Sequence, residues 1–383
     1  MSKSSIIIAG DCCLRGRTAS LNAEQLFSLL EDIEPIIQSA DVALANLETS
    51  VTESNVAPIS KSGPSIKSDA CILDVLSSIG FTGVTLANNH FADYGADGVE
   101  ESFRLIEQRG LWYVGAGMNA EDAAQIKYLQ VGNKKVAIIN ACEHEFTIAT
   151  NNKPGCNALN PIHQFKAIQE AKQKADNVIV IIHGGVEHYS LPTLRMQETF
   201  RFFIDAGADA VINHHQHCYS GYEMYQGKLI VYGLGNFFFD WQGQDANWNN
   251  GYMVRLTLGE KIDLELIPYI QNADTLGIRL MDYISKKQFD ADIAKLNEII
   301  VQPDQLQSHF TSWVKQKESE YLQILQPEIG KNIKRLDRWH LIPDRQRENW
   351  CPKFMTCERQ KLLKSLFQCE SHQDVMNEIL KLQ

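Results

Sequence analysis

Short apolar runs alternate with amphipathic stretches along roughly the first 270 residues of the chain. Runs of strand length separated by helical stretches are typical of a mixed sheet layered with helices. The amphipathic stretches at 22–40, 99–110, 161–175 and 194–208 carry apolar residues three and four positions apart, which predicts helices there. The predicted strands are "SIIIAGD", "VALANLE", "GVTLANN", "KVAIINAC", "NVIVIIHGG", "ADAVINHH", "LIVYGLGN" and "YMVRLTL".

The pattern changes near residue 280, where long stretches mixing charged and apolar residues begin. Such stretches predict helices. We therefore divide the chain into an α/β domain at residues 1–275 and a helical C-terminal region at residues 276–383. The composition alone does not say what this region does.

Five of the predicted strands end on polar side chains. In open α/β sheets, ligands bind beyond the carboxyl ends of the strands, so these side chains are expected to converge on one site. The clusters are Asp11, the pair Asn46 and Glu48, the run Asn88 to His90, His183, and the run His214 to His217.

Each cluster alone has an ordinary explanation. A lone histidine at a strand end is usually a hydrogen-bonded residue, Asp11 could cap a helix, and Glu48 could lie in a solvated turn. Together, however, carboxylates, imidazoles and an amide are the groups that a dinuclear hydrolytic metal site uses. On an extended segment, His215 and His217 would face the same side, and a further histidine could donate a proton to a leaving group.

Composition narrows the class of protein. Hydrophobic content of 44% and charged content of 22% are ordinary for a globular protein, and no apolar run is long enough to cross a membrane. The net charge of -11 argues against nucleic-acid binding. The short apolar run at the start does not resemble a secretory signal, so the expected location is cytoplasmic. Nine cysteines without a framework spacing are expected to be reduced, with Cys351 and Cys357 a weaker candidate for a partial metal site.

In this order the motifs resemble those of the calcineurin-like metallophosphoesterases, and more closely the CapA-type branch, named for poly-γ-glutamate capsule biosynthesis. The resemblance covers about residues 5 to 255. The matching segments are Gly10-Asp11, Asn46-Leu47-Glu48, Asn88-Asn89-His90 with Asp93, Gly95 and Gly98, His183 with Gly185 and Glu187, Gly207-Ala208-Asp209 with His215 and His217, and Tyr232 with Leu234-Gly235-Asn236-Phe237.

The resemblance implies a fold and a set of roles. The fold would be an α/β metallophosphoesterase sandwich, two mixed β-sheets flanked by helices, with the helical C-terminal region appended. Two divalent ions, of manganese, iron or zinc, would be its cofactors. Asp11 and His217 would bind one ion, Glu48 would bridge, and Asn89, His183 and His215 would bind the second. His90 would be the catalytic acid, and Asp93 would orient His90 or a neighbour.

Several positions depart from the family pattern. Cys13 stands where the wider superfamily has a histidine, and it could be a soft-metal ligand or a strand residue facing the core. Gln216 and Asn213 replace a proline and a glycine, and the usual N-terminal membrane anchor is not seen. The candidates for contacting substrate are Asn88, Glu187, Asn236, Lys61 and Arg15.

Two functions are compatible with these residues. The first is a metal-dependent, phosphoesterase-like hydrolase that acts on a phosphoester or amide-type bond of an anionic small molecule or polymer precursor, in capsule or exopolymer biosynthesis. The second is a non-catalytic accessory subunit of a polymer synthase, with a structural or degenerate metal site and the C-terminal region docking to the synthase. A sugar- or nucleotide-binding domain is disfavoured because the chain has no glycine-rich phosphate loop.

Overall fold

Two mixed β-sheets stack face to face in the computed structural model, which describes residues 4–241, 246–325 and 357–382. The first sheet has the order β18-β17-β16-β1-β2-β5-β6, and β15 also pairs with β1. The neighbours β1, β2, β5 and β6 are parallel, whereas β16, β17 and β18 are antiparallel. Its strands are β1 (Ser5–Cys12), β2 (Val42–Leu47), β5 (Gly83–Thr85), β6 (Trp112–Val114), β15 (Asn236–Phe238), β16 (Asn250–Leu258), β17 (Ile262–Gln271) and β18 (Ile278–Leu280).

The second sheet has the order β13-β14-β12-β11-β9-β8. Its central strands β9, β11, β12 and β14 are parallel, and the edges β8 and β13 are antiparallel to their neighbours. The strands are β8 (Lys127–Val131), β9 (Lys134–Cys142), β11 (Asn177–His183), β12 (Ala210–His214), β13 (Tyr222–Tyr225) and β14 (Lys228–Val231). Two short pairs lie outside the sheets, β3 (Ser50–Val51) with β4 (Lys67–Ser68) and β7 (Ala116–Gly117) with β10 (Gly155–Cys156).

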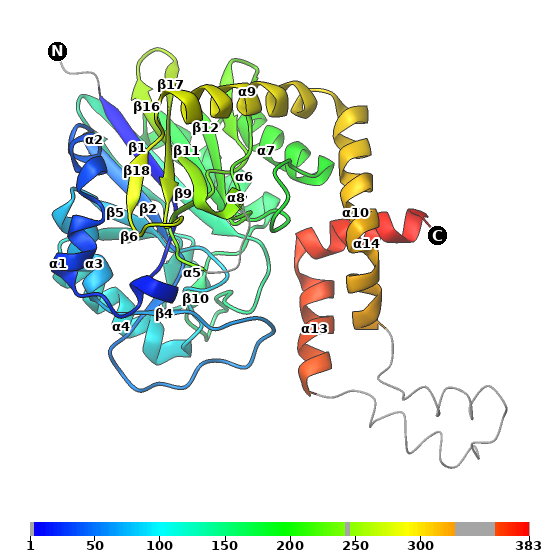
Figure 1. Cartoon of the computed structure of the whole chain (residues 1–383), viewed down its shortest axis with the longest axis horizontal. Coiled ribbons are helices and arrows are strands. Elements are labelled where there is room, and N and C mark those ends of the chain that lie inside the picture. The colour runs from blue at the N-terminus through cyan, green and yellow to red at the C-terminus, as the bar shows by residue number, and fades with distance from the viewer. Residues whose placement is uncertain (1–3, 242–245, 326–356, 383) are drawn as a thin grey trace.

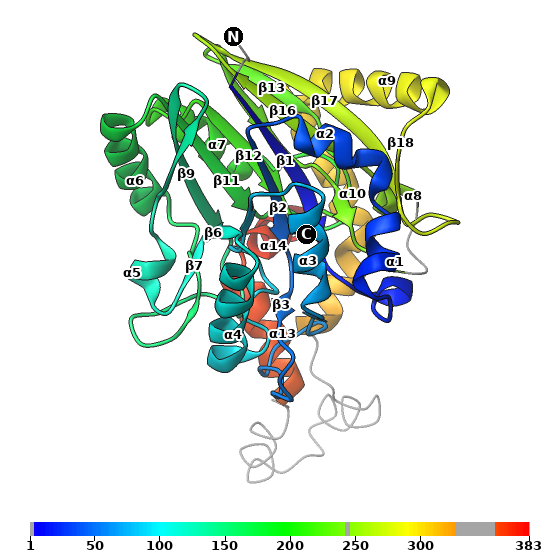
Figure 2. The ribbon, with the colours of Figure 1, turned by 90° about the vertical axis from the view of Figure 1, so that its left-hand side faces the viewer.

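Helices cover the outer face of each sheet. Those that follow early strands, α1 to α4, pack against the first sheet (Figure 2), and α6 and α7 pack against the second. The helices are α1 (Ala23–Ser28), α2 (Glu34–Gln38), α3 (Cys71–Ser78), α4 (Gly95–Gln108), α5 (Ala120–Ala123), α6 (Pro161–Lys174), α7 (Leu194–Asp205), α8 (Ala246–Asn249), α9 (Tyr283–Ile300), α10 (Pro303–Leu325), α13 (Cys357–Gln368) and α14 (Glu370–Leu382), with 3₁₀ turns η1 (Gly16–Thr18) and η2 (Glu31–Ile33).

The apolar runs explain this layering, because successive strand residues point to opposite faces and both faces are covered. In β1, Ile6 and Ile8 belong to the core between the two sheets, whereas Ile7 belongs to the core under the outer helices. In β11, Ile179 faces the other sheet and Val180 faces the helices. The predicted fold class, two mixed sheets flanked by helices with further helices at the C-terminus, is confirmed.

One predicted helix is broken. The stretch 22–40 forms α1, the 3₁₀ turn η2 and α2 instead of one continuous helix. Asn22 caps α1 by accepting a hydrogen bond from the backbone N–H of Gln25, and Pro35 lies in the first turn of α2. Proline is favoured there and disfavoured inside a helix, so the chain restarts instead of continuing.

The C-terminal helices pack against the sandwich. Figure 1 shows α9 along one edge and α10, α13 and α14 grouped at one side. Phe310 and Val314 of α10 and Val375 and Ile379 of α14 are buried in the same apolar core as α7. The division into domains at residue 275 stays a prediction. Strand β18, which follows that residue, still pairs with β17 of the first sheet. In the described part of the chain, no helix has both the length and the apolar character that a membrane crossing requires.

Candidate metal centre

The carboxyl ends of parallel strands from both sheets meet at one place. The register of β1 and β2 puts Asp11 beside Asn46, and that of β11 and β12 puts His183 beside His214. Gly10 permits the crowding, because a Cβ atom there would lie 1.9 Å from the carbonyl oxygen of Gly235. The predicted convergence of polar strand ends is therefore seen in the structure.

Glu48 lies at the centre of two groups of candidate ligands. One consists of Glu48, His183 and His215, and the other of Asp11, Glu48 and His217; within each group the donor atoms lie within 4.8 Å of one another. Oε1 of Glu48 lies 3.6 Å from Nε2 of His183 and 3.8 Å from Nε2 of His217. A carboxylate shared by two ligand groups has the placement of a bridging ligand.

Asn89 adds an amide oxygen beside the first group, and Asp11 lies close to His217 in the second. Oδ1 of Asn89 lies 3.0 Å from Nε2 of His183, on the side of His215. Oδ2 of Asp11 lies 3.6 Å from Nδ1 of His217. All six residues predicted as ligands are thus brought together.

The buried charge of this cluster fits a cation. Glu48 is fully buried, and neither of its carboxylate oxygens has a hydrogen-bond partner within the described residues. Burial and then the charge of Asp11 raise the pKa of Glu48 well above its usual value. Burial would also raise the pKa of Asp11, yet the neighbouring histidines hold it below its usual value. An uncompensated buried carboxylate is costly, and coordination to a metal ion removes that cost.

His90 is held by Asp93 and Lys61 beside the ligand cluster. Its Nδ1 lies 2.7 Å from Oδ2 of Asp93 and 3.1 Å from Nζ of Lys61, which also forms an ion pair with Asp93. Burial, and then the charge of Lys61, lower the pKa of His90 to about 4. Because Nδ1 is engaged, Nε2 is the ring nitrogen left for a ligand.

Three asparagine side chains position these groups. Asn88 accepts hydrogen bonds from the backbone of His90 and Phe91, which fixes the turn after β5. Asn236 places Oδ1 2.9 Å from Nδ1 of His217. Asn46 donates to Oδ1 of Asp11 over 2.7 Å. Such contacts orient ligand side chains, so Asn88 and Asn236 are placed to hold the candidate ligands in position.

Two cavities, of about 320 and about 180 Å³, open beside the cluster. The larger is lined by Asn89 and His90, and the smaller by His215. Loops of the sandwich and the C-terminal helices supply the rest of their walls. The residues that line both cavities are Glu145, Glu187, Glu320, Tyr321 and His372.

The sequence reasoning did not select Glu145, Glu320, Tyr321 or His372. Glu145 follows β9 as part of "CEHEF", a polar strand end of the kind that the other clusters share, so this signal was available. Burial raises the pKa of Glu145 to about 7. The three residues of α10 and α14 lie in a helical stretch whose sequence carries no motif.

The remaining predicted residues lie elsewhere, have partners or fall outside the described chain. The guanidinium of Arg15 stacks 3.9 Å from the centroid of the Trp241 ring, and Arg15 lines neither cavity. Lys61 lines the larger cavity but is paired with Asp93. Cys13 is buried in an apolar cluster with Phe239 and Trp248, which favours the core alternative over the ligand. Cys357 is exposed and Cys351 lies outside the described residues.

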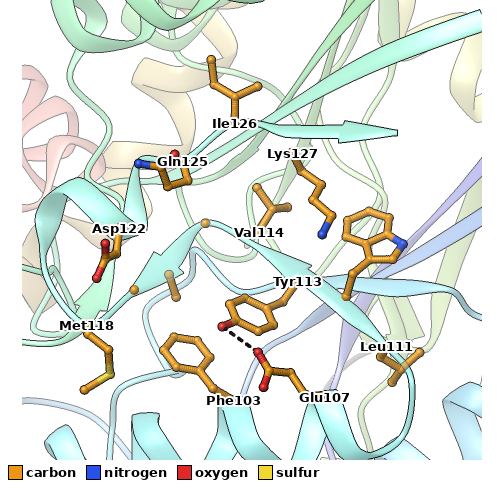
Figure 3. A pocket seen from close by; sticks show the side chains of 14 residues that line it. Phe103, Glu107, Leu111, Tyr113, Val114, Met118, Asp122, Gln125, Ile126 and Lys127 are labelled. Carbon is orange, nitrogen blue, oxygen red and sulfur yellow. Dashed lines mark hydrogen bonds between the residues drawn. The ribbon is translucent and has the colours of Figure 1, made fainter. Parts of the chain in front are cut away.

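A larger cavity, of about 530 Å³, lies away from these residues between α4, β6 and α5 (Figure 3). The hydroxyl of Tyr113 donates to Oε1 of Glu107 over 3.4 Å, and both residues line this cavity. None of the predicted site residues lines it. The candidate site is therefore the ligand cluster with its two adjoining cavities.

The structure defines an α/β sandwich of two mixed sheets, with carboxylate, imidazole and amide side chains gathered at the strand ends as candidate metal ligands. Within that class, the family described as "Bacterial capsule synthesis protein PGA_cap" matches residues 5–241, and the chain belongs to this family. The predicted family is confirmed.

Curated relatives carry names from the same process. "Capsule biosynthesis protein CapA" of Bacillus anthracis is 33% identical over 216 residues, covering 54% of this chain and 53% of its own. "PGA biosynthesis protein CapA" of Bacillus subtilis is 32% identical and covers 56% and 57%. A "Probable polyglutamine synthesis accessory protein" of Mycobacterium tuberculosis is 26% identical and covers 60% and 66%. The chain thus spans about half the length of the Bacillus relatives.

Solved structures with a similar fold include a phosphatase from Mycoplasma pneumoniae and a 5'-nucleotidase precursor from Thermus thermophilus. The first has a TM-score of 0.45 and 14% identity, covering 76% of this chain and 99% of its own. The second has a TM-score of 0.41 and 13% identity, covering 76% and 58%.

Proposed function

We propose that the chain is a metal-dependent hydrolase with a dinuclear centre, acting on a phosphoester or amide-type bond in the biosynthesis of a poly-γ-glutamate-like capsule or exopolymer. The observation that carries this proposal is Glu48, whose two carboxylate oxygens are buried without a hydrogen-bond partner in the described chain, between two groups of ligands. Family membership and the names of the Bacillus relatives supply the biosynthetic context.

In this proposal each side chain has a definite task. Asp11 and His217 would hold one ion, His183, His215 and Asn89 would hold the other, and Glu48 would be shared by both. Manganese, iron and zinc all suit these nitrogen and oxygen ligands. When bound, the ions would acidify a water molecule and offset charge that develops on the substrate.

His90 would be the acid for the leaving group in the fraction of molecules whose ring is protonated, because burial and Lys61 lower its pKa to about 4. Asp93 and Lys61 fix its ring through Nδ1, so that Nε2 is the atom available in the cavity. A positioned histidine can donate a proton only if its ring is held in hydrogen-bond reach of the leaving atom. Asp93 therefore acts here as a positioning residue.

The test is metal content together with turnover. We expect about two transition-metal ions per chain in the wild type and hydrolysis of bis(p-nitrophenyl) phosphate that a chelator abolishes. The His183→Ala/His217→Ala variant should lose both the ions and the activity. His163→Asn, on the exposed surface of α6, serves as the matched control and should retain both. A wild-type protein that binds no manganese, iron or zinc would contradict the proposal.

A second candidate function is that of an accessory subunit of a polymer synthase. It is favoured by the name of the Mycobacterium relative, an accessory protein of polymer synthesis, and by exposed apolar side chains on the C-terminal helices, such as Phe367, which is 72% exposed. Bound metal without turnover of phosphoester or amide substrates would favour this candidate. Turnover by the isolated chain would favour the hydrolase.

A further inference from the structure

Glu145, Cys369 and His372 form a third group of candidate metal ligands, separate from the two that share Glu48. One donor atom of each residue lies within 4.8 Å of the other two. Glu145 lies three residues after β9, Cys369 lies between α13 and α14, and His372 lies in the first turn of α14. The group therefore joins the sandwich to the C-terminal helices.

The three side chains are held for coordination. Cys369 is only 2% exposed. The hydroxyl of Tyr321 lies 2.9 Å from Nδ1 of His372, which leaves Nε2 as the ring nitrogen available for a ligand. Fixing one ring nitrogen so that the other faces a metal is the usual arrangement around ligand histidines. Glu145 forms no ion pair with a lysine or arginine in the described part of the chain.

The helix that carries His372 is held in place by other contacts. Nη2 of Arg195 lies 2.6 Å from Glu143 and its Nε lies 2.9 Å from Asp374 of α14. His144 places Nδ1 2.6 Å from Oε1 of Glu370. The loop after β9 and the start of α14 are thus fixed on both sides of the three ligands, which lowers the cost of bringing them together.

The donor set points to a particular kind of ion. A thiolate, an imidazole and a carboxylate together suit a borderline-soft divalent ion such as zinc better than magnesium or calcium. The three residues also line the cavity of about 180 Å³ beside His215. Three protein ligands and one face open to a cavity are the usual features of a zinc site that keeps a position for water or substrate.

A simpler alternative accounts for the same contacts. The thiol of Cys369 donates to Oε2 of Glu143 over 3.8 Å and could also donate to Glu145, and the three residues would then only help to dock α14. This alternative needs a protonated thiol, whereas a zinc site needs the thiolate. The two explanations therefore differ in whether sulfur is bonded to a metal.

We propose that Glu145, Cys369 and His372 bind a third divalent ion of zinc type, which fastens α14 to the loop after β9 in the wall of the substrate cavity. None of the three belongs to the dinuclear ligand set, so the site is independent of the proposed hydrolase activity.

The test counts zinc in the full-length protein after saturation with zinc sulfate and desalting. We expect about three ions per chain in the wild type and one fewer in Cys369→Ser and in His372→Gln. Cys357→Ser is the matched control, because Cys357 is an exposed cysteine at the start of α13. It should retain every ion.

Cobalt substitution shows whether sulfur is bonded to the metal, which counting ions does not. Cobalt bound to a thiolate absorbs in the near ultraviolet by charge transfer from sulfur, and no cysteine belongs to the dinuclear ligand groups. The band should be present in the wild type and in His183→Ala/His217→Ala, and absent in Cys369→Ser. If Cys369→Ser does not fold, the zinc content of Glu145→Gln is compared with that of the wild type. The thiolate band is then read from the wild-type cobalt protein alone.

The outcomes separate this proposal from the dinuclear centre. Equal zinc content in the wild type and Cys369→Ser, or no thiolate band in the cobalt protein, would overturn the third site and leave the dinuclear centre untouched. Loss of the band in Cys357→Ser would also overturn it, by placing the ion elsewhere. A wild-type protein that binds the thiolate-bound ion and no other would support the third site and contradict the hydrolase.

Discussion

Arg195 is the residue whose removal should detach the C-terminal helices from the sandwich. Its guanidinium lies 2.6 Å from Oε1 of Glu143 and 2.9 Å from Oδ2 of Asp374, whose side chains are 5% and 12% exposed. Arg195→Ala would leave both carboxylates buried without a cation. Removing one partner of a buried ion pair costs about 3–5 kcal/mol. Because the Arg195 side chain is 30% exposed and Ser371 still bonds Glu143, we expect the lower end, about 3 kcal/mol.

The loss should be local. Ser371 and Asp374 belong to α14, so the free energy that opposes detachment of this helix falls, whereas the strands of both sheets keep their contacts. A change of about 3 kcal/mol corresponds to an opening constant about 100-fold larger. Hydrogen exchange followed by mass spectrometry on peptides from residues 357–382 measures that constant directly.

Arg201→Ala is the matched control. Arg201 lies on the same helix, and its Nη2 is 2.6 Å from Oε2 of Glu223, with side-chain exposures of 26% and 3%. This pair joins α7 to β13 and does not contact α14, so exchange in 357–382 should stay at the wild-type rate. Unchanged exchange of these peptides in Arg195→Ala, or equal acceleration in Arg201→Ala, would refute the conclusion that Arg195 holds α14 on the sandwich.

Three further variants test other parts of the structure. His90→Asn should keep its metal ions and lose about 10²- to 10⁴-fold in kcat on bis(p-nitrophenyl) phosphate, whereas wild-type turnover would remove His90 from the mechanism. Gly10→Ala puts a Cβ atom 1.9 Å from the carbonyl oxygen of Gly235 and should cost more than about 3 kcal/mol, so a folded protein with wild-type Tm would contradict the close approach. The hydrogen bond to Glu370 raises the pKa of His144 above 6.5, so its stabilisation of α14 is complete below about pH 6.5 and is lost as pH rises through the raised value; hydrogen exchange corrected for intrinsic rates should show this loss in the wild type and not in Glu370→Gln.

The strands and the metal-ligand cluster were predictable because both follow from local pattern and sheet geometry. A continuous apolar run such as 178–182 is compatible with a strand covered on both faces, and parallel neighbours bring their carboxyl ends to one edge. His183 is therefore placed by the strand that precedes it. Asp11 and Glu48 are placed in the same way, at the ends of β1 and β2.

The residues that were missed depend on contacts that no local pattern encodes. Cys369 meets Glu145 across more than 200 positions of sequence, through the packing of α14 on the core of the second sheet. The ion pair of Lys61 could not be predicted either. The sequence around Lys61 does not show whether its ammonium group contacts Asp93 or solvent. Pro35 indicates a break in the predicted helix at 22–40, but the prediction gave more weight to the spacing of apolar residues.

The partners of the basic residues decide where an anionic substrate can find positive charge. Lys61 is paired with Asp93, and Arg15 stacks on Trp241 outside both cavities. Lys317 lines the smaller cavity, but its ammonium group lies 3.2 Å from Oε1 of Glu320. The cavity walls carry carboxylates, including Glu145 and Glu187, which would repel a polyanion. Because the lysines that line the cavities are paired with carboxylates, we expect the positive charge that attracts a phosphate or carboxylate to come chiefly from bound metal ions. Inorganic phosphate should therefore bind the metal-loaded protein in calorimetry and fail to bind after chelation, whereas equal binding to both forms would mean that a basic side chain, and not the metal centre, receives the anion.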